Sequence, residues 1–149
     1  MPINCTIVSV DEVQDFFANA IDGMGKQDGY PRNEGVPGSI ARWKTAKLCE
    51  LTENEFQHLI VPQEPKILLK DKPLQEVEGE DSIGTMNRYY QMLVEGEKLP
   101  AIIVRLPLHG DLEQGSYYIE DGAHKALGCK KYFEVNPYIP VLAYIGELG

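Results

Sequence analysis

One stretch, residues 117–128, constrains the fold more than any other part of the chain. It reads Tyr-Tyr-Ile-Glu-Asp-Gly-Ala-His-Lys-Ala-Leu-Gly, so that aromatic and β-branched residues typical of a buried strand give way to good helix formers. A strand is therefore expected to run directly into a helix, with Glu120, Asp121 and Gly122 as the joint. The Asp121 carboxylate can cap the helix, and Gly122 permits a sharp turn or the close approach of a ligand.

The start of this expected helix is a candidate anion site. The first turn of a helix exposes unpaired N–H groups and the positive end of the helix dipole, and here that turn also carries a histidine and a lysine. Backbone N–H groups beside a cation favour a bound phosphate. We therefore predict a phosphate seat formed by Gly122, Ala123, His124 and Lys125.

Three side chains at the joint could carry chemistry. His124 can donate a hydrogen bond to a phosphate or transfer a proton. Alternatively it packs near the helix start and bonds a carbonyl, but the motif around it favours the site. Glu120 and Asp121 could bind Mg²⁺ or act as a base. Adjacent strand residues point to opposite faces, so the two carboxylates are not expected to act as a pair. Asp121, next to the glycine, is the better candidate for catalysis and for the metal.

Three blocks follow one another along the C-terminal half of the chain, from about Asp81 onward. They are Leu99-Pro100-x-Ile102-x-Val104, then Tyr118-Ile119-x-Asp121-Gly122-x-His124-Lys125-Ala126, then Ile139-Pro140-Val141. This order resembles the ParB-like and sulfiredoxin-like superfamily, which includes partitioning proteins that bind CTP, free serine kinases that use a nucleoside phosphate and sulfiredoxins that use ATP. The resemblance implies a ParB/sulfiredoxin-like α+β fold with a nucleotide (ATP, ADP or CTP) and Mg²⁺ at the helix start.

Two departures from the family pattern bear on activity. Sulfiredoxins place their catalytic cysteine directly before the His-Arg pair, and Ala123 occupies that position here. A thiol-based reductase at that position is therefore excluded. Lys125 replaces the family's arginine, which keeps the positive charge but loses the planar fork that binds phosphate in a bidentate manner.

Three polar residues outside the joint are further candidates for nucleotide binding. Relatives often place groups that face the nucleotide on the helix before the Pro-Ile-x-Val strand, which implies a role for Asn87 and Arg88. A polar helix face exposed to solvent is the alternative. Arg105, within an apolar strand, is either a phosphate ligand at a buried edge or an outward-facing strand residue.

Composition indicates a single cytoplasmic domain. The 149 residues are 43% apolar and 25% charged, as in soluble globular proteins. No apolar run approaches the roughly 20 residues that cross a bilayer, and no signal peptide is evident, so no membrane partner is expected. The net charge of −9 disfavours broad DNA binding, which depends on neutralising phosphates. Cys5, Cys49 and Cys129 form no C-x-x-C pair, so we expect reduced thiols, at least partly in the core, rather than disulfides or a zinc site.

Periodicity and turn residues predict the remaining elements. Residues 1–39 are expected to form an N-terminal helix with a capping box at Ser9 and Glu12, and then a loop over 25–39, rich in glycine and proline, that is either a lid or a surface loop. Residues 40–149 are expected to form the core. The expected core strands are 40–48, 67–69, 101–106, 117–119 and 138–145, after a short first strand at 5–10, and the expected core helices begin near Thr52, near Ser82 and at 123. This pattern predicts a small mixed β-sheet with packed helices, an α+β domain.

Three functional classes fit these expectations. The leading hypothesis is a phosphotransferase or nucleotide hydrolase, in which N–H groups, Lys125 and Mg²⁺ stabilise phosphoryl oxygens and Asp121 or Glu120 is the base. The alternative is a non-catalytic module that uses a nucleotide to switch contacts with a protein or DNA partner. The chain ends almost at its last expected strand, without the helix-turn-helix of the partitioning relatives, so DNA binding is not expected without a partner. Acidic composition disfavours the third class, a ParB-like nuclease. The phosphorylated ligand, the acceptor and the oligomeric state are left open.

Overall fold

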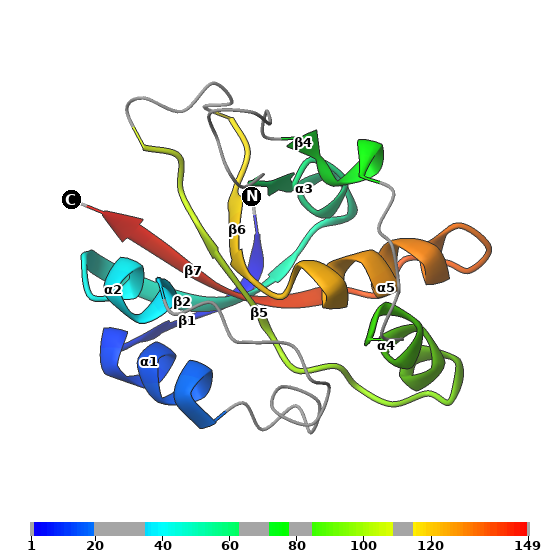
Figure 1. Ribbon diagram of the computed structural model, residues 1–149, viewed down its shortest axis with the longest axis horizontal. Helices are drawn as coiled ribbons and strands as arrows, with labels where there is room; N and C mark the ends of the chain where they lie inside the picture. The colour runs from blue at the N-terminus through cyan, green and yellow to red at the C-terminus, as the bar shows by residue number, and fades with distance from the viewer. Residues whose placement is uncertain (1, 20–34, 63–71, 78–84, 109–114, 149) are drawn as a thin grey trace.

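The computed structural model describes residues 2–19, 35–62, 72–77, 85–108 and 115–148 (Figure 1). Among these residues, seven strands form one mixed sheet in the order β1-β2-β7-β5-β6-β3-β4. The strands are β1 (Ile3–Val8), β2 (Trp43–Leu51), β3 (Ile60–Val61), β4 (Lys72–Pro73), β5 (Ile102–Arg105), β6 (Tyr118–Asp121) and β7 (Val141–Leu148). The helices are α1 (Val10–Asn19), α2 (Val36–Ile40), α3 (Glu53–Gln57), α4 (Thr85–Val94) and α5 (Ala123–Phe133), with a 3₁₀ turn at Leu74–Glu76. The predicted mixed sheet with packed helices is confirmed.

The middle of the sheet is where the strands are buried on both faces. β5 is buried at all its positions and pairs in parallel with β7 and antiparallel with β6. The antiparallel pairing of the segments on either side of residues 109–114 confirms the expected pairing of these two strands. Because β5 must be covered on both sides, it reads as a continuous apolar run, Ile-Ile-Val, before it reaches Arg105.

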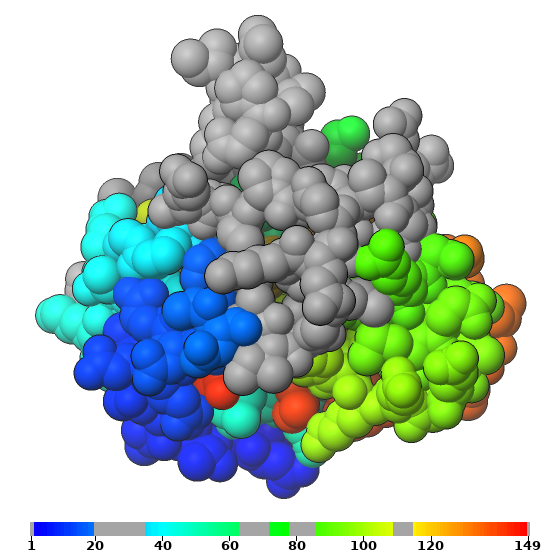
Figure 2. Space-filling model, turned by 60° about the horizontal axis from the view of Figure 1, so that its bottom comes forward, coloured from blue at the N-terminus to red at the C-terminus, as the bar shows by residue number. Residues whose placement is uncertain are grey.

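Helices cover both faces of the sheet, and alternate residues of β5 identify the two cores. Ile102 and Val104 pack in a core that includes residues of α4 and α5, whereas Ile103 packs in a second core with residues of α1 and α2. Consecutive strand residues point to opposite faces, so the two helix pairs lie on opposite sides of β5. In Figure 2, α1 and α2 (blue to cyan) and α4 (green) lie at opposite sides of the face shown.

Most expected helix starts are found, but several strand boundaries differ: β1 is Ile3–Val8 rather than 5–10, and β7 is Val141–Leu148 rather than 138–145. Thr52 and Glu55 form the predicted capping box of α3 in both directions, and the Glu12 N–H donates to Ser9 Oγ at 3.0 Å. The expected strand at 40–48 is wrong at its start, because α2 continues to Ile40 and β2 begins at Trp43. Part of the expected loop at 25–39 is therefore helical, with a proline in the first turn, where its missing N–H has no cost. The expected strand at 67–69 and the candidate lid at 25–34 lie outside the described residues.

Two of the three cysteines are joined, so the expectation of reduced thiols is wrong for them. Cys5 and Cys49 form a disulfide between β1 and β2 with Cα atoms 4.2 Å apart. Asn4 has a positive φ of 52°, and the strand register shifts between Ile3 and Thr6. Spacing along the chain gives no sign of this irregularity, which brings the cysteines together. Cys129 is free and buried.

Removing this disulfide should destabilise the fold measurably. A loop of 44 residues is closed by the bond, and a native crosslink of this kind contributes about 2 to 4 kcal/mol. We expect the loss in Cys5→Ser to lie near the lower end of this range, since β1 is an edge strand whose residues are exposed except for the half-buried Val8. Urea denaturation of Cys5→Ser and of Cys129→Ala without reductant measures the effect. Adding reductant should destabilise the wild type and Cys129→Ala but leave Cys5→Ser unchanged, and equal sensitivity of all three proteins would contradict the bond.

Candidate functional site

The joint between β6 and α5 has the predicted strand, turn and helix. β6 ends at Asp121, Gly122 adopts a left-handed conformation with φ 101° and ψ 24°, and α5 begins at Ala123. A Cβ at this glycine would lie 2.9 Å from Cγ2 of Ile102. Only glycine can adopt the positive φ and also lie this close to Ile102. The close contact that requires a glycine at position 122 is therefore the one with β5.

The N-cap residue of α5 differs from the expected one. It is Gly122, which has no side chain to cap the helix, and Asp121 lies one position before it. The first intrahelical bond runs from the Ala126 N–H to the Gly122 carbonyl. The first turn therefore begins without a hydrogen bond from the side chain of its N-cap residue.

Lys125 lies in the interior rather than on the surface of the first turn. It is 3% exposed, and its Nζ donates to the Ala101 carbonyl at 3.0 Å. The ammonium also lies 5.9 Å from the ring centre of Phe16 on α1 and 5.6 Å from that of Tyr89 on α4, within range of cation–π attraction. Its positive charge is thus held inside the fold by groups from three separate segments of the chain.

Arg105, which is buried, forms an ion pair with the half-buried Glu120. Arg105 Nε lies 2.9 Å from Glu120 Oε1, and Ser39 Oγ of α2 donates to the same oxygen at 2.8 Å. The guanidinium carbon also lies 4.7 Å from the ring centre of Tyr118. Arg105 is therefore not the outward-facing strand residue of our second alternative, and Glu120 is held by two donors, so it would have to leave them to act as a base.

Glu120 lies at a β-bulge in β6 and has no partner residue opposite it in β5. Asp121 is opposite Ile103 and Ile119 is opposite Val104, so β6 has an extra residue where β5 has none. The strict alternation that predicted opposite faces for Glu120 and Asp121 does not apply at such a place. Asp121 and His124 are both half-buried beside the turn. Within the described ranges, no group of three or more His, Cys, Asp or Glu side chains could hold a metal ion.

Asn87 lies near the wrong end of α5 to reach the phosphate seat. Its Oδ1 accepts from Lys131 Nζ at 3.4 Å, and Lys131 is in the last turn of α5. At about 1.5 Å of rise per residue, that turn is roughly 12 Å along the helix from Ala123. Asn87 and Arg88 are both exposed on α4, and the α4 residue that does approach Lys125 is Tyr89.

Sequence reasoning missed the neighbours that fix the two charged groups. Phe16, Ser39 and Tyr89 come from α1, α2 and α4. Phe16 belongs to an expected helical stripe, which gives a signal for burial but none for the lysine that it meets. An apolar cavity of about 250 Å³ beside Lys125 was also missed, since its walls come from distant parts of the chain.

Three side chains whose pKa values are raised in the folded protein, Tyr117, Cys129 and Tyr138, should make the fold sensitive to high pH. Burial raises the pKa of the Cys129 thiol to about 12, against an opposing effect of Lys125, and burial also raises the pKa of Tyr138 to about 12. The pKa of Tyr117 rises to about 12 through burial and the nearby Glu55 carboxylate. Each group releases its proton more readily when unfolded, so the unfolded state binds fewer protons above pH 9 and stability falls as pH rises.

We therefore expect the urea midpoint to decline from about pH 9 towards pH 12, the interval between the ordinary cysteine value and the raised ones. Cys129→Ala removes the thiol and should delay the onset to about pH 10, where unfolded tyrosines begin to ionise. Denaturation curves at half-unit pH steps, each measured from freshly adjusted samples, provide the test. A midpoint that stays constant up to pH 11 would contradict these raised values.

Comparison of the chain with models of known protein families, with curated proteins and with solved structures found no match. The resemblance to ParB-like and sulfiredoxin-like proteins therefore stays a prediction that depends on the three sequence blocks. In the part of the chain that the structure describes, none of the helices combines the length and apolar character needed to cross a bilayer.

Proposed function

We propose that this domain binds a phosphorylated small molecule, with ATP, ADP or CTP as the first candidates, at the start of α5. The observation that supports this most directly is a helix that begins after a glycine N-cap and carries the buried ammonium of Lys125 in its first turn. Both the N–H groups and the cation favour an anion. The sequence resemblance supports a nucleotide as the source of that anion.

The residues of the turn would each have a different role in binding the phosphorylated ligand. The N–H groups of Ala123 and its successors would bind phosphate oxygens, and the His124 side chain could add a donor. Lys125 would contribute through its charge, since its Nζ donates to the Ala101 carbonyl. Mg²⁺ would arrive with the nucleotide, and Asp121 is the carboxylate best placed to meet it.

Phosphoryl transfer or nucleotide hydrolysis would be the second step of this proposal. It needs a base near an acceptor hydroxyl or water, and Asp121 or His124 would have to supply it. Glu120 is a poorer candidate than the sequence suggested, because Arg105 and Ser39 hold it. Because Glu120 is held in this way, the structure gives some support to the alternative, a non-catalytic module in which a nucleotide switches contacts with a partner.

A charge placed at Ala123 tests the proposed site. Ala123→Glu puts a carboxylate in the first turn, where it interacts favourably with the helix dipole but repels phosphate, whereas Ala123→Gln has the same bulk without the charge. In a thermal-shift screen with ATP, ADP, CTP and GTP, with and without Mg²⁺, we expect one nucleotide to raise the melting temperature of the wild type and of Ala123→Gln. At a hundredfold excess over Kd the rise should be roughly 5 to 10 °C.

Ala123→Glu should lose this shift without melting lower than Ala123→Gln in the absence of ligand. The nucleotide found in this way can then be incubated with the wild type and Asp121→Asn to look for hydrolysis. If no nucleotide raises the melting temperature, the proposed function is wrong. If a nucleotide raises the melting temperatures of Ala123→Glu and Ala123→Gln equally, it binds at another place.

A further inference from the structure

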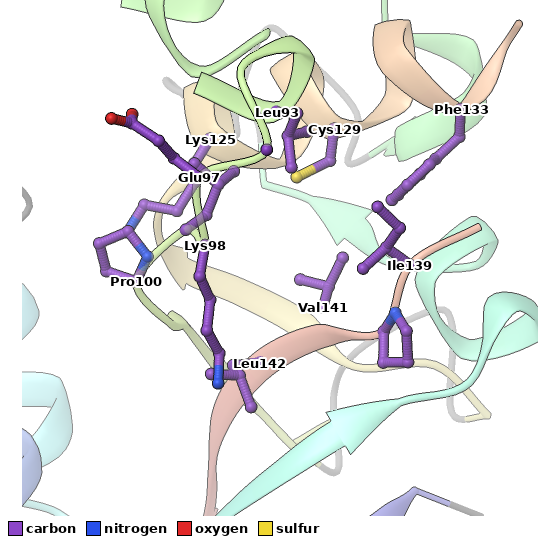
Figure 3. Close-up of a pocket in the computed structure, with 13 residues that line it drawn as sticks. Leu93, Glu97, Lys98, Pro100, Lys125, Cys129, Phe133, Ile139, Val141 and Leu142 are labelled. Atoms are coloured by element: carbon purple, nitrogen blue, oxygen red, sulfur yellow. The ribbon is translucent and has the colours of Figure 1, made fainter. Parts of the chain in front are cut away.

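The cavity beside Lys125 is a second candidate site, which shares only this lysine with the proposed phosphate site at the helix start. Its volume is about 250 Å³, and it lies between α4 and the loop after it, α5, and the beginning of β7 (Figure 3). Most of its walls are apolar side chains: Leu93, Leu99, Phe133, Ile139, Val141 and Leu142. The residues that begin α5, from Gly122 to His124, are not among its walls.

The charged side chains of the cavity lie on one side of it, with the ends of Lys98, Lys125 and Glu97 apart from one another in Figure 3. Figure 3 shows Lys98 and Lys125 on the side opposite Phe133 and Ile139, while Glu97 directs its carboxylate away from the other side chains. The lining thus has a cationic end and an apolar end. An amphipathic ligand with a negative head would complement both ends, whereas a positive head would be repelled.

The remaining polar side chain in the lining is Cys129, one helical turn after Lys125 on α5. Burial raises its pKa to about 12, so at neutral pH it is a thiol without charge. Such a thiol behaves as a small apolar group. It therefore belongs to the apolar wall, and it offers a position from which the cavity can be filled.

We propose that this cavity binds a small aliphatic carboxylic acid, with its carboxylate toward Lys98 and Lys125 and its chain toward Phe133 and Ile139. The volume of about 250 Å³ exceeds the roughly 150 Å³ that accommodates benzene, and it is below the roughly 300 Å³ at which sites for drug-sized molecules begin. A chain of six to ten carbons, by this rough comparison, is the range to examine. The site goes beyond the proposed nucleotide function, and Lys125 is the one residue that the two sites have in common.

A series of straight-chain acids tests the proposal on the intact protein. We expect calorimetry with butanoate, hexanoate, octanoate and decanoate, all below their micellar concentrations, to show affinity that rises roughly fourfold per methylene, which corresponds to about 0.8 kcal/mol. The rise should stop when the cavity is full. Octanol should bind more weakly than octanoate, and octylamine should bind most weakly of the three.

Variants at Cys129 test whether the ligand occupies the cavity. Cys129→Leu fills part of the space and should weaken octanoate at least tenfold, whereas Cys129→Ala leaves it open and should bind as the wild type does. If Cys129→Leu does not fold, Ile139→Trp provides a second way to block the cavity, because Ile139 is 47% exposed and a larger ring there need not disturb the core. Lys98→Met should weaken octanoate about threefold, as expected for one exposed charge, and leave octanol unchanged.

Several outcomes would overturn the proposal. These are no binding by any acid in the series, equal affinity for octanoate and octylamine, or unchanged octanoate binding in both Cys129→Leu and Ile139→Trp. The Ala123→Glu variant separates this site from the nucleotide site. It should bind octanoate as the wild type does, whether or not any nucleotide binds at the start of α5.

Discussion

Replacing Glu120 by alanine should lower the free energy of unfolding by about 3 kcal/mol or more. The change removes the carboxylate that faces Arg105 at 2.9 Å and leaves a guanidinium whose side chain is 8% exposed. Breaking a buried pair from one side typically costs about 3 to 5 kcal/mol, because the remaining charge stays in a poorly solvated place. Urea denaturation followed by circular dichroism measures the loss.

A double variant tests whether the loss of stability in Glu120→Ala comes from the unpaired charge of Arg105. The double variant Arg105→Met/Glu120→Met removes both charges and retains apolar bulk, so it should recover much of the stability that Glu120→Ala loses. Ser39→Ala should cost only about 1 kcal/mol, the usual value for one hydrogen bond. If the double variant loses as much stability as the single variants Arg105→Met and Glu120→Met lose in sum, Arg105 and Glu120 do not interact and the loss in Glu120→Ala has another cause.

This experiment bears on function, because Glu120 is one of the candidate bases. A catalytic carboxylate can usually be replaced with little effect on folding, whereas a carboxylate that neutralises Arg105 cannot. A stable Glu120→Gln protein that had lost nucleotide hydrolysis would restore Glu120 as a base. A destabilised protein with unchanged nucleotide binding would leave Asp121 and His124 as the candidates.

Local features of the sequence predicted the parts of the fold that local forces determine. The change from Tyr118 and Ile119 to helix formers placed the β6–α5 joint, and Gly122 has the positive φ that its position suggested. The capping box at Thr52 formed for the same reason, since its hydrogen bonds join residues three apart. Such signals need no knowledge of what packs against the segment.

The environment of each candidate site residue could not be predicted in this way. Arg105 meets Glu120 because β5 and β6 pair with a bulge, and Lys125 is buried because α1 and α4 both approach it. In each case the neighbour is distant in the chain, and the sequence pattern around the charged residue is the same whether it is buried or exposed. Cys5 and Cys49 show the same limit, since an irregular register brings them together.

Among the glycines in the described residues, Gly146 should be the least tolerant of an added methyl group. In β7, a Cβ at Gly146 would fall within the indole ring of Trp43, a side chain that is 5% exposed. The backbone cannot easily move away, because β7 is hydrogen-bonded to β2 on one side and to β5 on the other. Overpacking typically costs about 1 to 3 kcal/mol and can cost more, and with rigid groups on both sides we expect Gly146→Ala to lose about 3 kcal/mol or more.

Gly38→Ala is the matched control, because a Cβ at that position of α2 would meet nothing within 4 Å. It should raise stability by about 0.5 kcal/mol, as alanine does in place of a helical glycine whose conformation it can adopt. Trp43 is the one tryptophan of the chain, so its fluorescence reports directly on this contact during urea denaturation. Gly146→Ala should show a lower midpoint and an altered emission spectrum in the folded state, since the ring must move to admit the methyl group. Equal midpoints for the two variants would mean that Trp43 does not lie over Gly146, and the packing of β2 against β7 at this end of the sheet would have to be revised.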